Sequence, residues 1–220
     1  MSNITVTTAA TSRRLTTVPN VQAALDETGE ETLFAQLIDR ASAEVEKFCN
    51  QTFAQERVVE LLGARGETIL MLTRTPIVTV HEIKLDGDVV EASNYKVHDA
   101  DAGTLFNSGG WTSTQMMRQG LTRWPEHVQD RLWSVDYTAG FLVPAAAGGS
   151  PAPNLPYDIE DATIETVKAM WKGKGRDPSV TSRRLGDWAE SYGGGKQGSS
   201  ISGRIPDSAK SLLLPWQRSA

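Results

Sequence analysis

Cysteine is nearly absent from this sequence, since Cys49 is the only one among 220 residues. A single thiol excludes an intramolecular disulfide framework and a zinc site made of clustered cysteines, and it is typical of proteins from a reducing compartment. Cys49 follows Phe48 on the apolar side of a predicted helix, where a thiol behaves as a small hydrophobic side chain. We therefore expect Cys49 to lie in the core of a protein that is made in a cytoplasm.

Histidine is scarce as well, with only His81, His98 and His127. None of them stands in a His-x-x-x-His or Glu-x-x-His spacing, so the sequence shows no ligand set for catalytic zinc. The nearest approach to an acid–base or metal cluster is His98 with Asp99 and Asp101, at the end of a predicted strand in turn-like sequence. We interpret this group as an ordinary polar turn, and a small hydrolase that uses the three residues is the alternative.

Long apolar runs and nucleotide-binding loops are also missing. No stretch approaches the roughly 20 apolar residues that cross a bilayer, and residues 1–6 show no basic segment leading into an apolar one, so we expect neither membrane insertion nor export. The glycine run Gly193–Gly195 is followed by Lys196 and Gln197, whereas a phosphate loop needs Ser or Thr after the lysine and a strand before the glycines. The sequence therefore predicts no catalytic residue, no metal and no cofactor.

The charge of the chain is acidic overall but unevenly distributed. Residues 1–154 hold 12 Lys and Arg against 19 Asp and Glu, whereas residues 155–220 hold 10 against 8. Binding to nucleic-acid phosphates requires clustered basic residues, so the composition disfavours a general nucleic-acid-binding protein. The more basic C-terminal part either meets an acidic partner or is simply a solvated polar surface.

Apolar residues at helical spacing predict four helices, near residues 17–28, 31–50, 156–172 and 206–214. The pattern is clearest in the second helix, where seven apolar side chains fall on one face and charged ones fall mostly on the other. We expect this apolar face to belong to the core. It consists of Leu33, Leu37, Ile38, Ala41, Val45, Phe48 and Cys49.

Between residues 55 and 143 the period changes to that of strands, with β-branched and alternating segments separated by Gly and Pro. Asp86-Gly87 predicts a hairpin turn, because glycine adopts a positive φ readily and aspartate tolerates it. The chain is thus predicted to be an α+β protein. Its helical body would comprise residues 17–54 and 155–172, and residues 55–143 would be an inserted, antiparallel β-rich domain.

Two flanking segments complete the predicted organisation. Residues 1–16 are rich in Thr and lack apolar periodicity, so we expect an extended or poorly ordered lead-in that only a neighbouring molecule could tie down. Residues 173–220 form an arm whose Gly- and Ser-rich composition, including Gly193–Gly195 and Gly198–Ser200, is typical of loops. The short helix near 206–214 lies at the end of this arm.

Three groups of segments, taken in their order along the chain, carry a family resemblance. They are Leu37–Phe53; then Thr75–Val80, Leu85–Gly87, Tyr95–Val97 and Val135–Phe141; and finally Val180–Tyr192, Ile205-Pro206 and Leu212–Trp216. In this order the segments resemble the head–tail connector, or adaptor, family of tailed bacteriophages. The resemblance spans residues 30–216, most of the chain.

The resemblance implies a structural virion protein and not an enzyme. It implies a ring of identical subunits, expected to be a dodecamer, that binds beneath the portal after DNA packaging and joins the head to the tail. The implied partners are the portal protein, a stopper or tail-completion protein, and DNA that passes through the channel without sequence-specific binding. The protein would be made in the host bacterial cytoplasm and located in the neck of the virion. A stopper or tail-completion protein of the same neck region is the alternative role.

An arm that becomes ordered only on a partner suits such a ring, because each ring contact joins two different surfaces. Aromatic and arginine side chains are enriched among the residues that dominate interface energetics. The residues expected to bind the portal or a neighbouring subunit are Arg183, Arg184, Trp188, Tyr192, Leu213 and Trp216. Alternatively, Leu212–Leu214 dock the last helix on its own domain, and the two interpretations can hold for different residues.

Overall fold

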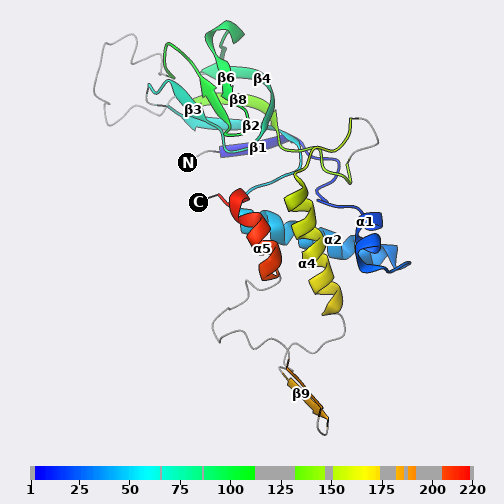
Figure 1. Cartoon of the computed structure of the whole chain (residues 1–220). Helices are drawn as coiled ribbons and strands as arrows, with labels where there is room; N and C mark the ends of the chain where they lie inside the picture. The colour runs from blue at the N-terminus through cyan, green and yellow to red at the C-terminus, as the bar shows by residue number, and fades with distance from the viewer. Residues whose placement is uncertain are drawn as a thin grey trace. The chain divides into compact units, whose positions relative to one another are not determined.

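The computed structural model of the chain describes residues 3–64, 66–85, 87–111, 132–146, 151–173, 182–185, 188–191 and 205–218. The fold is mixed α+β, as predicted, and it divides into two compact units. Unit 1 comprises Met1–Arg13 and Thr52–Asn154, and unit 2 comprises Arg14–Gln51 and Leu155–Ala220. Figure 1 shows strands in the first unit and mainly helices in the second. Each described helix is too short or too polar to cross a membrane.

A five-stranded antiparallel sheet organises unit 1, with the strand order β1-β2-β8-β4-β5. β4 and β5 form a hairpin in which Leu85 pairs with Asp88 and Gly87 has a φ of +94°, so the hairpin predicted there is confirmed. β8 pairs with both β2 and β4, which puts a strand from late in unit 1 at the centre of the sheet. The strands are β1 (Asn3–Thr8), β2 (Glu56–Gly63), β4 (Ile77–Leu85), β5 (Asp88–Val89) and β8 (Leu132–Ala139).

A second antiparallel sheet, of three strands in the order β3-β7-β6, contributes to the same core. Its strands are β3 (Ile69–Met71), β6 (Lys96–Asp99) and β7 (Thr104–Phe106), and a short 3-10 helix, η1 (Ala92–Asn94), precedes β6. Trp111 and Trp133 meet edge to face in this core, with 4.9 Å between their ring centroids, an arrangement that stabilises beyond the area it buries. Both sheets supply the buried apolar residues, among them Val58, Leu70, Ile77, Ile83, Leu105, Val135 and Tyr137.

Strand β1 corrects the expectation that the first residues lack a partner within their own chain. Residues 3–6 pair with residues 58–61 of β2 in antiparallel register. Thr7 Oγ1 adds a hydrogen bond to the carbonyl oxygen of Arg57 at 3.1 Å. The sequence gives little sign of this strand because an edge strand that buries little side-chain area need not alternate apolar and polar residues.

Gly140 allows the end of β8 to approach residues 53–54, which precede β2. It has a φ of +106°, and a Cβ at this position would lie 2.6 Å from the carbonyl oxygen of Ala54. With glycine there, Phe141 N donates to the carbonyl oxygen of Phe53 at 2.7 Å, and Gly140 N donates to that of Pro76 at 2.9 Å. Both the backbone angle and the close contact require glycine.

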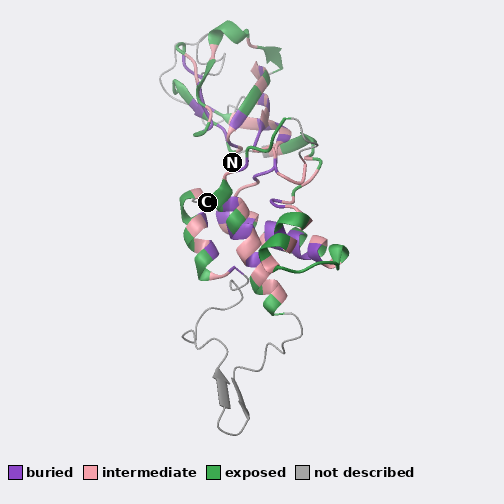
Figure 2. Cartoon of the chain, turned by 45° about the vertical axis from the view of Figure 1, so that its right-hand side comes forward, coloured by how far each residue is buried: buried purple, intermediate pink, exposed green. Residues whose placement is uncertain are grey.

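Three helices, α1 (Val18–Leu25), α2 (Glu31–Cys49) and α4 (Tyr157–Lys172), form the core of unit 2, and all three lie where apolar periodicity predicts a helix. The Thr17 side chain caps α1 by accepting a hydrogen bond from Asn20 N. This helix ends earlier than predicted, because Asp26 adopts left-handed backbone angles. Figure 2 shows buried residues along one side of α2 and exposed ones along the other. The shared core contains Val21, Phe34, Leu37, Ile38, Ala41 and Val167.

The last described segment folds against α2 and α4 of unit 2. It consists of α5 (Asp207–Leu213) and a 3-10 helix, η2 (Leu214–Trp216). Two hydrogen bonds fasten it to the end of α2: Arg218 N donates to the carbonyl oxygen of Cys49, and Gln51 Nε2 donates to that of Trp216, each at 3.0 Å. The predicted helix near the end of the arm is therefore confirmed.

A two-stranded antiparallel hairpin precedes this segment in the chain, formed by β9 (Ser182–Leu185) and β10 (Trp188–Ser191). This corrects the expectation of loop-like structure throughout the arm. Strands of four residues are too short to show a recognisable alternation, and neighbouring glycine-rich sequence favours a loop interpretation. No other described strand pairs with either β9 or β10.

Candidate interaction surfaces

Four of the six predicted partner-binding residues belong to the β9–β10 hairpin or border it. Arg183 and Arg184 lie in β9, and Trp188 begins β10. In the register of the hairpin, Arg184 lies opposite Ala189. Tyr192, the residue after β10, lies outside the described residues. The two arginines and the tryptophan, which are close in sequence, thus share one hairpin, and this hairpin is what the sequence did not predict.

The other two predicted residues lie in the last helical segment of unit 2. Leu213 and Ala209 have no exposed surface. Trp216 is half-buried, and its carbonyl oxygen accepts the hydrogen bond from Gln51. Leu213 therefore agrees with the interpretation in which the last helix docks on its own domain. Leu214 is 60% exposed, so this segment does offer an apolar side chain to solvent or to a partner.

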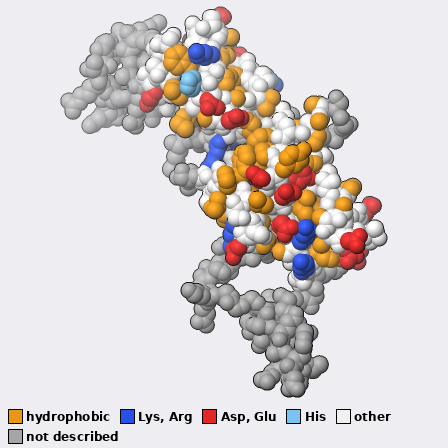
Figure 3. Space-filling view, in the orientation of Figure 1, with side chains coloured by type: hydrophobic (Ala, Val, Ile, Leu, Met, Phe, Trp, Pro, Cys, Tyr) orange, Lys and Arg blue, Asp and Glu red, His pale blue; other side chains and the backbone are white. Residues whose placement is uncertain are grey.

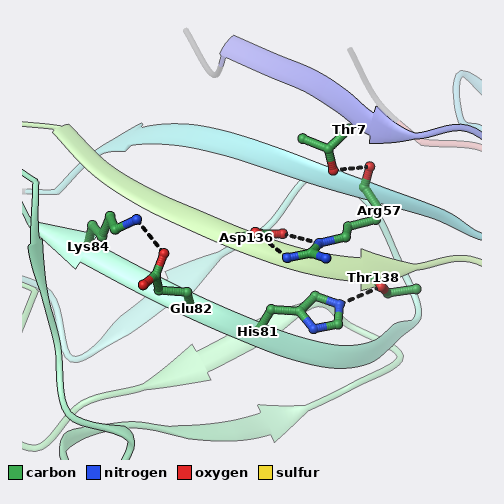
Figure 4. Close-up of polar contacts among 7 residues, drawn as sticks. All are labelled: Thr7, Arg57, His81, Glu82, Lys84, Asp136 and Thr138. Carbon is green, nitrogen blue, oxygen red and sulfur yellow. Dashed lines mark hydrogen bonds and ion pairs between the residues drawn. The ribbon is translucent and has the colours of Figure 1, made fainter.

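Arg57 and Asp136 lie at the centre of a polar network on a face of the five-stranded sheet (Figure 4). Arg57 Nε and Nη2 donate to the two carboxylate oxygens of Asp136 at 2.9 and 2.7 Å, the bidentate geometry in which such pairs are strongest. The hydrogen bond from Arg57 lowers the pKa of Asp136, and the same bond raises the pKa of Arg57. The pair therefore stays ionised at neutral pH.

Further polar pairs lie beside these two residues. Glu82 and Lys84 form an ion pair along β4, and His81 Nε2 lies 2.8 Å from Thr138 Oγ1 of β8 (Figure 4). On the face seen in Figure 3, acidic side chains are spread over the described residues, and basic ones are fewer and more scattered. Because Lys84 already has a carboxylate partner, as Arg57 does, this face disfavours binding of phosphate groups.

Glu60 is a buried carboxylate inside unit 1 that is hydrogen bonded through both oxygens. It has no exposed surface. Tyr137 Oη donates to Glu60 Oε2 at 2.6 Å, and Thr73 donates through Oγ1 to Oε1 at 2.5 Å and through N to Oε2 at 3.1 Å. Arg74 N in turn donates to Tyr137 Oη at 3.2 Å. Burial and the neighbouring carboxylate raise the pKa of Tyr137 well above its usual range. The network fastens residues 73–74 to β2 and β8.

Glu56 is a second buried carboxylate, placed between two guanidinium groups. Its side chain is only 4% exposed. Arg13 donates to Glu56 Oε1 through Nε at 3.1 Å and through Nη2 at 2.8 Å, and Arg74 Nη2 lies 3.9 Å from Oε2. Since a buried charge is costly without a partner, Glu56 fixes the segment that follows β1 to the rest of unit 1.

The surface of unit 1 is hollowed where β1 ends. The hollow has a volume of about 350 Å³ and begins at Thr8, the last residue of β1. Its walls combine apolar side chains with hydroxyl, amide, imidazole and charged groups. The lining residues are 8–12, 55–57, 81, 138, 141–143 and 146.

His98 and Asp99 are the last residues of β6, Asp101 lies in the turn that follows, and all three are exposed. Asp99 Oδ1 accepts hydrogen bonds from the backbone N–H groups of Asp101 and Ala102, both at 3.0 Å, which is the arrangement of an Asx turn. The ring of His98 lies near that of Phe106, with 6.4 Å between centroids. Where the structure is described, no three His, Cys, Asp or Glu side chains are grouped to hold a metal ion. The geometry of these residues agrees with the polar-turn interpretation.

Cys49 is fully buried at the end of α2, so its predicted place in the core is confirmed. Burial raises the pKa of its thiol to about 12. At neutral pH the group is therefore a protonated thiol, which is a poor nucleophile.

The sequence matches the family of head completion proteins over residues 14–182. No curated protein matches it. Among solved structures, it is similar to a chain in the neck of an empty gene transfer agent (GTA) particle computed with C6 symmetry, with 16% identity, 99% of this chain and 96% of that chain covered, and a TM-score of 0.58. A chain in the neck of the native GTA particle, computed with C12 symmetry, is 17% identical, with the same coverage of both chains and a TM-score of 0.58. A chain in the virion of the native particle is 16% identical, again with the same coverage of both chains, and has a TM-score of 0.56.

At such low identity these structures show a shared fold alone. The family match is broader evidence, since it starts at Arg14, reaches Ser182, and so includes sequence from both units. It confirms, at the level of the family, the resemblance to head–tail connector proteins. Because the match covers more than half of the sequence, the chain belongs to the family of head completion proteins.

Proposed function

We propose that the protein is a structural subunit of the virion neck that closes the filled head and joins it to the tail. The observation that carries the proposal is the match to head completion proteins over residues 14–182. The fold supports it, because 99% of the chain aligns with chains from the neck and virion of a particle that resembles a phage. The function is then one of binding and geometry, not of turnover.

We propose further that identical subunits form a ring, with twelve as the expected number. Neck structures with C6 and C12 symmetry contain chains of this fold, which supports a ring with a sixfold or twelvefold axis. A ring of this kind needs two different surfaces on each subunit. The chain offers them in its sheet-rich unit 1 and in unit 2 with its hairpin.

The adaptor role is the finer proposal: the ring binds the portal directly, and a stopper or tail-completion protein binds beneath it. Arg183, Arg184, Trp188 and Tyr192 are the proposed contacts with the portal or with a neighbouring subunit, because arginine and aromatic residues are the usual anchors of interfaces. Leu213 has a different role in this proposal. It is buried, and it keeps α5 in place.

DNA would pass through the ring without being held by it. The first 154 residues carry an excess of acidic side chains, and on the described sheet face Arg57 is engaged with Asp136. Fixed negative charge repels phosphate, so weak contact with the passing duplex is expected. Tight binding of duplex DNA at moderate salt would contradict this part of the proposal.

Electron microscopy of the purified protein mixed with purified portal tests the proposed role. An adaptor forms rings on the portal without any other neck protein, whereas a stopper binds only after another neck protein is present. The broader proposal fails if particles assembled without this protein still join filled heads to tails at the normal frequency.

The hairpin contacts are tested by Arg183→Ala combined with Arg184→Ala. Portal binding or ring formation should weaken at least tenfold. The control removes two basic side chains elsewhere in unit 2, by Lys168→Ala with Lys210→Ala, both of which form ion pairs within their own helices. Equal losses in the two double variants would show that only net charge matters. Truncation before α5 is a poorer test, because it also removes the buried Leu213.

A further inference from the structure

The outer edge of β1 is an unprotected sheet edge. Among the described strands, only β2 pairs with β1, so one row of its backbone N–H and C=O groups has no strand beside it. The strand has six residues and contains no charged residue, proline or glycine, and five of the six are β-branched. Natural proteins usually block such edges with charges, prolines, bulges or short strands. An edge with this composition favours the addition of another strand.

The opposite edge of the same sheet carries these protective features. β5 has only two residues, one of which is Asp88. β4, the strand next to it, has irregular register between Ile77 and Thr79 and again between Val80 and Glu82. Bulges and short charged strands discourage edge-to-edge pairing. β1 has one register shift of its own, between Val6 and Thr8, but residues 3–6 pair with β2 without a break. The stretch of residues 3–6 is therefore the more open of the two sheet edges.

The β9–β10 hairpin, in turn, lacks a third strand: it contains two strands, and in the described part of the chain no other strand extends it. A two-stranded hairpin is marginally stable in water unless a third strand or a packed face supports it. β9 carries two adjacent arginines among its four residues, whereas β10 carries only Glu190 as a charged residue. β10 is therefore the better edge for pairing.

We propose that, in the ring, β10 of one subunit adds to the outer edge of β1 of the neighbouring subunit. This inference rests on the proposed function, since it requires a ring of identical copies. The contact joins two different surfaces, as a closed ring demands, and main-chain hydrogen bonds between strands supply its affinity.

Cysteine cross-linking within assembled rings tests the contact. Neighbouring strands lie about 4.8 Å apart, which is within the Cα–Cα range that a disulfide spans. Thr5→Cys, near the middle of β1, is combined in turn with a cysteine at each of residues 188–191, so that every register of β10 is sampled. The natural Cys49 is buried and contributes little background.

In rings verified by electron microscopy before oxidation, at least one of the four pairs should convert most of the monomer band into a ladder of multimers on a non-reducing gel. The control places the first cysteine on the opposite edge, as Val89→Cys, at a side chain that is 62% exposed. It should give no ladder with the same four partners.

Three results would overturn the inference. Rings without a ladder, or ladders of equal strength from Thr5→Cys and Val89→Cys, would refute the contact and leave the proposed function standing. A cross-link confined to single chains would place the pairing within one copy and refute it as well. Absence of any ring, alone or on the portal, would refute the ring itself and the contact with it.

Discussion

Arg13 and Arg14 are adjacent in the sequence, yet they bind carboxylates in different units. Arg13 Nη2 donates to Glu56 of unit 1 at 2.8 Å, and Arg14 Nε and Nη2 donate to Asp39 of unit 2 at 2.6 and 2.9 Å. The chain leaves one unit and enters the other between these two residues. An arginine–carboxylate pair within each unit thus fixes the connecting residue that belongs to that unit.

The two arginines should differ in their effect on stability. Arg13→Ala leaves Glu56, which is 4% exposed, with Arg74 Nη2 at 3.9 Å as its remaining basic neighbour. A buried charge that loses its main partner is costly, so we expect a loss of about 2 kcal/mol in the free energy of unfolding. Arg14→Ala breaks an exposed pair and should cost less than about 1 kcal/mol. Urea unfolding followed by tryptophan fluorescence measures the stability of both variants. Equal losses would contradict the larger role given to the pair of Arg13 with Glu56.

Tyr137→Phe tests the buried network around Glu60. The change removes the 2.6 Å hydrogen bond to the Glu60 carboxylate and the acceptor for Arg74 N, while it keeps the ring in the core. We expect a loss of about 2 kcal/mol in the free energy of unfolding, because a charged, buried acceptor loses one of its donors. Tyr157→Phe, at a side chain that is 82% exposed, is the control and should change stability by less than about 0.5 kcal/mol.

Leu213→Ala and Leu214→Ala form a matched pair in neighbouring positions. Leu213 has no exposed surface, and Leu214 is 60% exposed. Leu213→Ala should lower the free energy of unfolding by about 3 kcal/mol, since it removes buried methyl groups and leaves a cavity. Leu214→Ala should stay within about 0.5 kcal/mol. If Leu213→Ala leaves thermal unfolding unchanged, α5 does not depend on this docking contact.

Asp136→Asn should change how stability depends on pH. The pKa of Asp136 is lowered in the folded protein by the hydrogen bond from Arg57, so its contribution is present above the ordinary carboxyl pKa, about 3.9. That contribution is lost as the pH falls through the lower, folded value. The stability gap between wild type and Asp136→Asn should therefore be full at pH 7 and should close at strongly acidic pH. Chemical unfolding at a series of pH values measures the gap, and a constant gap would contradict the prediction.

Cys49 should resist alkylation in the folded protein. Its thiol is buried, and burial raises its pKa to about 12, so at pH 8 the thiolate is a negligible fraction. Mass spectrometry after treatment with iodoacetamide should find unmodified protein in buffer and a single modification in urea. Rapid labelling without denaturant would mean that α2 frays at its end or that the last segment of unit 2 detaches.

Helices and interior strands could be predicted because their side chains have two different environments. In α2 the apolar residues repeat at helical spacing, since one face packs against Val21 and Val167 and the other meets water. In β2 the buried positions alternate as far as Glu60. The burial of Glu60 itself could not be predicted, because its hydrogen-bond donors, Tyr137 and Thr73, are distant in sequence.

The two segments with unexpected structure are both sheet edges. The described side chains of β1 are mostly exposed, and β9 and β10 have only four residues each, so their sequences show no period to detect. Their partners are set by backbone hydrogen bonds, which depend little on the side chain, since only proline lacks the N–H donor. The sequence also places β8 in a sheet without showing that it lies between β2 and β4, because strand order depends on long-range pairing.

The division into two units has a genetic consequence. The chain passes from one unit to the other at residues 13–14, 51–52 and 154–155. Any single recombination breakpoint between residues 14 and 154 therefore separates the pieces of both units at once. In such a hybrid, the core of each unit is built from segments of two different parents, whose side chains must still pack together. Exchange between related genomes should therefore favour transfer of the whole coding sequence.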